Sequence, residues 1–210
     1  MACTGLFLCF FLVVHLAGNL LLFAGQQKYD EYAHMVHANK LFLISAEIFL
    51  YVAFAAHLYL AFATRAENAS ARGDVSYAER RSKRTDRVIN VAGQTPDSTM
   101  FFTGAVVLFF LIVHLCDFKF ELFHGTRLDG VGPYEKAGLI LGDGFRKLVY
   151  LTGSVFLGIH VSHGLVSALQ SLGINHPRIN RALPMLGIGF ALVIALGYVL
   201  IVLTAGAAGK

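Results

Sequence analysis

The sequence predicts an all-α integral membrane protein, a single domain (1–210) built as a bundle of five transmembrane helices. Two observations predict this fold. The 210 residues are 56% hydrophobic and only 14% charged, against roughly 45–50% and 25% in soluble proteins. The hydrophobic residues also form five long runs, and about 20 mostly apolar residues in a helix cross a hydrocarbon layer of about 30 Å. Lipid offers backbone groups no partner, so each run is expected to be helical.

The five expected spans lie at about residues 2–24, 41–63, 100–118, 148–169 and 184–204. The first run lacks a basic leader and continues past any plausible cleavage point, so we expect a true span rather than a cleavable signal peptide. Because this span begins almost at Met1, we suspect that the natural start of the chain lies upstream.

The segment 64–99, between the second and third spans, carries the densest basic cluster. Its basic residues are Arg65, Arg72, Arg80, Arg81, Lys83, Arg84 and Arg87. The positive-inside rule places this loop in the cytoplasm. With five spans, the N-terminus then lies inside, and segments 25–40 and 119–147 lie outside. A loop that only holds the topology and a docking or lipid-headgroup surface are equal alternatives for 64–99.

Cysteine and charge patterns disfavour several classes of protein. Cys3, Cys9 and Cys116 lie within apolar runs without CxxC or CxxCH spacing. Disulfide scaffolding, iron–sulfur ligation and covalent haem attachment therefore have no support in the sequence. Seventeen Lys and Arg against thirteen Asp and Glu give a net charge of +4. This charge is too weak and scattered to predict a nucleic-acid partner.

Nine histidines are many for so apolar a chain, and four of them lie in four different spans. They are His15, His57, His114 and His160. An ionisable residue in a membrane is costly and normally faces the bundle interior, where it binds a ligand or relays protons. For one histidine alone, a hydrogen bond between helices is the simpler explanation. Four in four successive spans favour cofactor binding, because neutral imidazole is a common ligand of haem iron.

The depth of each histidine suggests how they pair. The depths from the outer ends of the spans, at about 1.5 Å per residue, are roughly 6 Å for His114, 14 Å for His15, 18 Å for His160 and 24 Å for His57. Two stacked layers result if His15 pairs with His114 and His57 pairs with His160. The depths of His15 and His160 differ too little to exclude the pairing in which these two histidines change places.

Two imidazoles per iron, without a thiolate or CxxCH, are typical of noncovalent low-spin haems that carry electrons. The first four spans would then enclose two haem b groups. Glycines and phenylalanines flank the histidines and could leave room for flat macrocycles, although ordinary helix packing is the more common role of such residues.

Four strings around these histidines resemble one known family. The strings are FLVVHLAGNLLLF, AEIFLYVAFAAHLYLAF, FFLIVHLCDFKF and IHVSHGLVSALQSLGINHPR. In this order they resemble the five-helix, di-haem cytochrome b subunit that anchors succinate dehydrogenase and fumarate reductase, and the match covers nearly the whole chain. The family usually has polar and basic residues before the first span, which this sequence lacks.

The resemblance implies ligands, partners and an activity. It implies that His57 and His160 bind the haem nearer a cytoplasmic iron–sulfur subunit, and that His15 and His114 bind the outer haem. Flavin and iron–sulfur clusters belong to separate flavoprotein and iron–sulfur subunits, which also hold the dicarboxylate active site. The implied complex is a succinate:quinone oxidoreductase of the respiratory chain and tricarboxylic acid cycle, in the inner (cytoplasmic) membrane of a bacterium. Its expected quinone is menaquinone.

Glu47 is the candidate quinone or proton site. Apart from the boundary residue Asp117, it is the only carboxylate well inside an expected span, about 15 Å closer to the outer face than His57. Burial favours the neutral carboxyl unless a charged partner is near. A hydrogen bond to a neighbouring helix explains Glu47 equally well.

Other polar residues have less specific explanations. His163 lies one turn beyond His160 and could ligate iron in its place, a choice that depth does not settle. The family pattern favours His160 as the ligand and His163 as its neighbour or a propionate partner. A proton entrance in the outer connection would use Asp30, Glu31, His34 and His37, although a solvated loop is the simpler interpretation. His124 and His176 are expected in loops without a redox role.

Two other functions remain. The cytochrome b subunit of another quinone-linked enzyme, such as a hydrogenase or formate dehydrogenase, would use the same four histidines, although the order of the strings and the fifth span disfavour it. A haem-free, proton-conducting transporter would use the histidines as titrating groups. An absorption spectrum separates the haem proteins from the transporter, and a co-purifying flavoprotein separates succinate dehydrogenase from hydrogenase.

Overall fold

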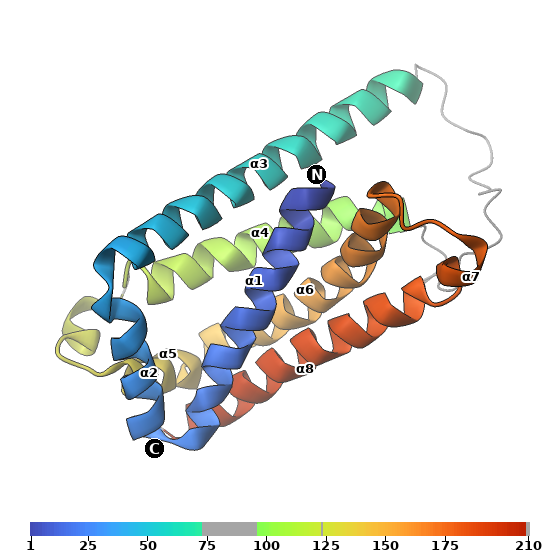
Figure 1. Ribbon diagram of the computed structural model, residues 1–210. Coiled ribbons are helices and arrows are strands. Elements are labelled where there is room, and N and C mark those ends of the chain that lie inside the picture. The colour runs from blue at the N-terminus through green and yellow to red at the C-terminus, as the bar shows by residue number, and fades with distance from the viewer. Residues whose placement is uncertain (73–95, 123, 209–210) are drawn as a thin grey trace.

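A computed structural model describes residues 1–72, 96–122 and 124–208 of the chain. These residues form helices and no strand. Five helices are long and apolar enough to cross a membrane, which confirms the expected helix type and number of spans. They are α1 (Ala2–Leu20), α3 (Lys40–Arg72), α4 (Pro96–Phe118), α6 (Gly144–Ser171) and α8 (Leu183–Ala208) (Figure 1).

The observed helices extend beyond several expected boundaries. A 3-10 turn, η1 (Leu21–Ala24), completes the first span. The second helix continues from the expected end at 63 to Arg72, because alanine, arginine and glutamate in this stretch are good helix formers. Most of the expected cytoplasmic loop 64–99, including its basic run from Arg80 to Arg87, lies outside the described residues.

Short helices occupy the connections. They are α2 (Gln26–Ala38), η2 (Gly125–Leu128), α5 (Pro133–Gly142) and α7 (Pro177–Asn180). The connection around Asp30 and His34 is helical rather than a loop, since both residues lie in α2, which has no buried residue. Gly25, with φ of 92°, makes the sharp turn that separates η1 from α2, a conformation that glycine adopts without strain.

The spanning helices alternate in direction, which gives the bundle two distinct ends (Figure 1). The Met1 end holds the starts of α1, α4 and α8, the ends of α3 and α6, and α7. The α2/α5 end holds the opposite termini together with α2 and α5. At this second end, Oδ1 of Asp30 accepts a hydrogen bond from the backbone N–H of Tyr134 at 2.9 Å. Asp30 thus ties α2 to the first turn of α5.

The best-packed part of the bundle lies where α6 meets α1 and α8. Leu16, Leu157 and Ile194 belong to this buried cluster, and Ile194 is fully buried. Small residues bring α6 and α8 close together: a Cβ on Gly158 would lie 2.7 Å from Cβ of Ala195. Close packing of small residues is a common way for helices to associate in lipid.

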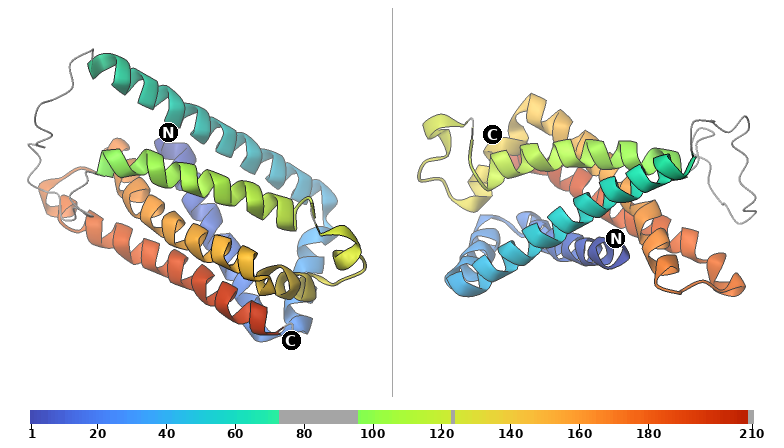
Figure 2. Two further views of the ribbon diagram at one scale, coloured as in Figure 1. Left: turned by 180° about the vertical axis from the view of Figure 1, so that it is seen from behind. Right: turned by 90° about the horizontal axis from the view of Figure 1, so that it is seen from above.

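Helix α3 lies on the opposite side of the bundle from α8 (Figures 1 and 2). No residue of its most apolar stretch is buried. It contacts the other helices through a few rings, including Phe7 against Phe49 with centroids 4.8 Å apart. Near the Met1 end, the Arg65 guanidinium lies 3.8 Å from the centre of the Phe101 ring.

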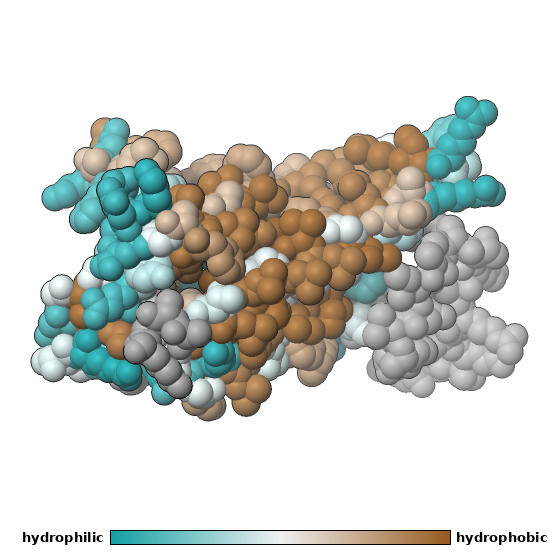
Figure 3. All heavy atoms as spheres, turned by 90° about the horizontal axis from the view of Figure 1, so that it is seen from below, coloured by the Kyte–Doolittle hydropathy of each residue, from teal (hydrophilic) through white to brown (hydrophobic). Residues whose placement is uncertain are grey.

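The surface of the molecule fits a lipid environment. Figure 3 shows hydrophobic residues along the middle of the molecule and hydrophilic residues toward its ends. Large apolar side chains such as Phe10, Val52 and Val193 are exposed on α1, α3 and α8. Soluble proteins rarely expose so continuous an apolar surface.

Candidate functional site

The bundle brings His15 of α1 and His114 of α4 together toward the α2/α5 end. Their ring centroids lie 5.8 Å apart, and their planes are inclined by 80°. An imidazole nitrogen binds a first-row metal at about 2.0–2.1 Å, so two rings that share one ion from opposite sides would have centres about 6 Å apart. The spacing of this pair is therefore suited to one metal ion between the rings.

The second pair, His57 of α3 and His160 of α6, lies toward the Met1 end. The two imidazoles are close enough to interact electrostatically. Each contacts a Thr-Gly dipeptide of a neighbouring helix. The dipeptides are Thr4-Gly5 on α1 and Thr103-Gly104 on α4. In each case the threonine Oγ1 lies 3.2 Å from Nδ1 of the histidine.

The threonine hydroxyl fixes which nitrogen of His160 carries the proton. Oγ1 of Thr103 also lies 3.0 Å from the carbonyl oxygen of Thr99 and 3.1 Å from that of Met100. A hydroxyl has one proton to donate, and a carbonyl can only accept it. The hydroxyl therefore accepts the Nδ1–H of His160. This leaves the lone pair on Nε2, the nitrogen that could bind a metal.

The same arrangement occurs at His57. Oγ1 of Thr4 donates to the carbonyl of Met1 at 2.9 Å and so accepts from Nδ1 of His57. At His15, Nδ1 lies 2.9 Å from the hydroxyl of Tyr198, on α8, and 3.4 Å from the amide nitrogen of Asn19. Hydrogen bonds of this kind fix the tautomer and orientation of histidine ligands in metal sites.

His114 differs from the other three histidines. Its Nδ1 is buried and has no hydrogen-bond partner among the described residues. The rings of Phe110, Phe118 and Tyr150 surround it, with centroids 6.0, 5.4 and 5.9 Å away. A buried polar group without a partner costs about 1–3 kcal/mol. Such groups in a folded protein commonly mark a functional position.

Two glycines allow His57 and His160 to lie against neighbouring helices. A Cβ on Gly5 would lie 3.5 Å from Cε1 of His57, and a Cβ on Gly104 would lie 3.3 Å from Cε1 of His160. The second distance is tighter than an ordinary van der Waals contact. A larger residue at 104 would push against the imidazole.

The paired histidines are compatible with a haem. Among the described residues, no group of three or more His, Cys, Asp and Glu side chains is arranged to hold a metal. The histidines come in pairs, and a pair suffices when the bound group supplies the other ligands itself. A porphyrin supplies four nitrogens, so two imidazoles complete the coordination of its iron.

Glu47 forms an ion pair with Lys119, which follows α4. The carboxylate is about two-thirds buried, with 31% of its side chain exposed, and the pair lies toward the α2/α5 end. Glu47 therefore has a charged partner, which the sequence alone leaves open. His163 lies on α6 and is partly buried, without a side-chain hydrogen bond to any described residue.

A chain of hydrogen bonds leads from His15 to α2. Nδ2 of Asn19 donates to the carbonyl of His15 at 2.8 Å, and its 3.4 Å contact with Nδ1 of the same residue is weaker. The hydroxyl of Tyr29 donates to Oδ1 of Asn19 at 3.4 Å. Burial, together with Tyr32 and Asp30, raises the pKa of Tyr29. The phenol therefore keeps the proton that it donates.

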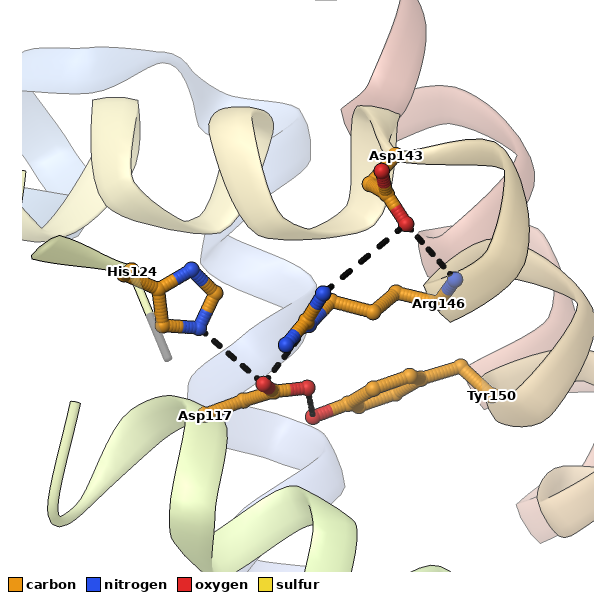
Figure 4. Close-up of polar contacts among 5 residues, drawn as sticks. All are labelled: Asp117, His124, Asp143, Arg146 and Tyr150. Atoms are coloured by element: carbon orange, nitrogen blue, oxygen red, sulfur yellow. Dashed lines mark hydrogen bonds and ion pairs between the residues drawn. The ribbon is translucent and has the colours of Figure 1, made fainter. Parts of the chain in front are cut away.

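The structure also assembles a buried polar cluster that the sequence does not predict (Figure 4). Asp117 is only 1% exposed. Its Oδ1 accepts from Nε of Arg146 at 2.7 Å and from Nε2 of His124 at 3.0 Å, and its Oδ2 accepts from Tyr150 at 3.1 Å. Asp117, at the end of α4 as expected, is thus a buried carboxylate, and His124, in the expected loop, is its partner.

Comparison of the chain with protein-family models, with curated proteins and with solved structures finds no match in any of the three. The function must therefore be inferred from the residues of the site.

Proposed function

We propose that this chain is a membrane-embedded cytochrome b with two haem b groups, the anchor subunit of a succinate:quinone oxidoreductase. The observation that carries the proposal is the distance of 5.8 Å between the ring centroids of His15 and His114 inside the helical bundle. A second pair, His57 and His160, lies toward the opposite end of the same bundle. Four imidazoles at two levels are what two haems with paired histidine ligands require.

Bound haem would supply reversible one-electron chemistry at iron. The two histidines of each pair would hold one haem between them. Two such groups along the bundle would allow electrons to cross between its ends.

The other residues of the site hold the imidazoles in place. Hydroxyls of Thr4 and Thr103 accept the Nδ1–H of His57 and His160 and leave Nε2 free, and the hydroxyl of Tyr198 lies 2.9 Å from Nδ1 of His15. A partner on the far nitrogen also raises the basicity of the ligating nitrogen. We expect these hydroxyls to favour the oxidised iron, because a more basic ligand stabilises the higher charge.

We place quinone chemistry at the α2/α5 end, the end of the His15–His114 pair. Reduction of a quinone takes two electrons and two protons, so it needs a group that exchanges protons. Glu47 is our candidate for this group, because its carboxylate is partly buried and paired with Lys119. His163, close to His160, is our candidate to contact a haem propionate at the other end.

Partner subunits would dock at the Met1 end. Several basic residues of the described part gather there, on α3, on α7 and after α7. They are Arg65, Arg72, Arg178 and Arg181. The described part has more basic residues at the α2/α5 end, so the cytoplasmic side is assigned from the dense basic segment 64–99 of the sequence, which joins α3 to α4 at the Met1 end. The Met1 end would receive an iron–sulfur subunit that carries electrons to or from a flavoprotein. Menaquinone is the quinone that we expect in the membrane.

One observation favours a second function. The hydrogen-bonded sequence from Tyr29 through Asn19 to His15 resembles what a haem-free, proton-conducting bundle would need. The spacing of His15 and His114 favours the cytochrome, because a proton path has no need for two rings at a metal-binding separation.

The test is a spectrum of the purified membrane complex. Dithionite-reduced minus oxidised spectra should show a b-type haem at two haems per chain, and a flavoprotein should co-purify. Absence of a reducible b-type spectrum in protein produced with an adequate haem supply would contradict the proposal and favour the proton-conducting bundle. Haem without a flavoprotein partner would favour another quinone-linked cytochrome b.

A further inference from the structure

A buried ion pair lies beside His114 and has no part in the proposed function. Asp117 follows His114 by three residues on α4, so the two side chains lie on one face of the helix, about 4.5 Å apart along its axis. Arg146 enters from the first turn of α6, and its Nε donates to the carboxylate at 2.7 Å. The side chain of Asp117 is 1% exposed and that of Arg146 is 22% exposed.

Tyr150 joins this ion pair to the histidine. Its hydroxyl donates to Oδ2 of Asp117 at 3.1 Å, and its ring lies edge-on to the ring of His114 with centroids 5.9 Å apart. The rings of Phe110 and Phe118 pack against the same tyrosine at 5.3 and 6.0 Å. The packed ring of Tyr150 therefore holds the charged pair at a fixed distance from the imidazole of His114.

Charges in this position act strongly on their surroundings. Aromatic rings and apolar helices screen a charge far less than water does. Other ion pairs near the α2/α5 end, Glu47 with Lys119 and Glu121 with Lys136, are more exposed. Solvent and salt weaken the field of such exposed pairs. The pair of Asp117 and Arg146 is thus the main fixed charge close to His114 in the described part of the chain.

We propose that Asp117 and Arg146 are positioning residues that set the reduction potential of the haem held by His15 and His114. The proposal rests on the proposed function. Oxidised haem iron carries one more positive charge than reduced iron, so a nearby anion favours oxidation and a nearby cation favours reduction. The two charges oppose each other, and their balance sets the potential.

Single substitutions should shift this potential in opposite directions. In Asp117→Asn, the guanidinium loses its closer anion and keeps only Asp143, whose Oδ1 lies 4.0 Å from Nη1, so the potential should rise. In Arg146→Gln, the carboxylate loses its cationic partner and keeps the hydrogen bonds from His124 and Tyr150, so the potential should fall. In the double variant, both charges are gone and the potential should return toward that of the wild type. If the two residues had only a structural role, both single substitutions would shift the potential in the same direction. The double substitution would then shift the potential by at least as much as either single one.

The experiment is a redox titration of the purified complex at mildly alkaline pH, with the two haems resolved by their difference spectra. Only the haem that is lost in a His114→Ala variant should respond. Glu121→Gln serves as the control, because it removes one charge of a more exposed pair at the same end, and it should leave both potentials unchanged. If the Asp117→Asn complex does not assemble, Asp117→Glu should restore both haems at near-normal potentials. Arg146→Gln then still tests the direction in which the potential shifts.

The outcomes separate this inference from the proposed function. A wild-type complex without b-type haem would contradict the proposed function. Two normal haems whose potentials do not change in the charge variants, or change in the same direction, would contradict only the effect of Asp117 and Arg146 on the potential.

Discussion

The hydroxyl of Thr103 lies 3.2 Å from Nδ1 of His160, between that imidazole and the backbone of α4, the helix that carries Thr103. Because the hydroxyl donates its proton to a carbonyl of that backbone, it accepts the Nδ1–H of His160. Thr4 holds His57 in the same way. Residues from α1 and α4 thus fix the two histidines of α3 and α6 in the tautomer that suits a metal ligand.

Replacing Thr103 by valine should raise the potential of one haem. Valine keeps the shape of the side chain but removes the acceptor, which makes the ligating nitrogen less basic. Loss of the hydrogen bond should also cost about 1 kcal/mol of stability. A redox titration checks the shift, which should be confined to the haem at the Met1 end.

Thr204→Val is the matched control for this substitution. The hydroxyl of Thr204 bonds only backbone carbonyls of its own helix, at 2.7 and 3.3 Å, and lies at the other end of the bundle. The Thr204→Val substitution should change the potential of neither haem. Unchanged potentials in Thr103→Val would show that this hydroxyl does not act on a ligand.

Gly104→Ala should disturb the haem bound through His160. The added Cβ would lie 3.3 Å from Cε1 of the imidazole, so the ring must move by a few tenths of an ångström. We expect a lower haem content or an altered spectrum at this site, measured by difference spectroscopy. Gly189→Ala makes the same change on α8, where nothing lies within 4 Å of the new atom. Equal effects of the two substitutions would argue against close contact at Gly104.

Glu47→Gln should lower quinone turnover and leave both haem spectra normal. The ion pair with Lys119 is partly exposed, so its loss should cost at most about 1 kcal/mol of stability. A fall in turnover would then report on proton exchange rather than on folding. Lys119→Met breaks the same pair but keeps the carboxyl, so it should retain more activity. Normal quinone turnover in Glu47→Gln would remove Glu47 from the proposed site.

Hydropathy is sufficient to locate the spans, because the cost of placing polar residues in lipid leaves a strong signal over 20 residues. It cannot predict α2, whose residues are polar and carry no such signal. The histidine and carboxylate residues of α2 are equally typical of a solvated loop. Hydropathy also does not predict the extension of α3 to Arg72, because the last turns of this helix are polar and are helical by propensity rather than by burial.

The partners of the histidines are harder to predict than the histidines themselves. Tyr198 lies 183 residues from His15, in a span that is not expected to contribute to the site. The Thr-Gly dipeptides do leave a signal, since the first and third spans carry the same two residues, Thr4-Gly5 and Thr103-Gly104. The sequence places Asp117 only at the boundary of a span, because tertiary structure alone brings Arg146 and His124 to it.

The most direct test of the central claim is the haem content of four variants, in which His15, His57, His114 and His160 are each replaced by alanine. Difference spectra of each purified complex should show the loss of one haem. Changes at His15 and His114 should remove the same haem, and changes at His57 and His160 should remove the other. Four variants that keep both haems, or a grouping that joins His15 with His160, would contradict this pairing of the ligands.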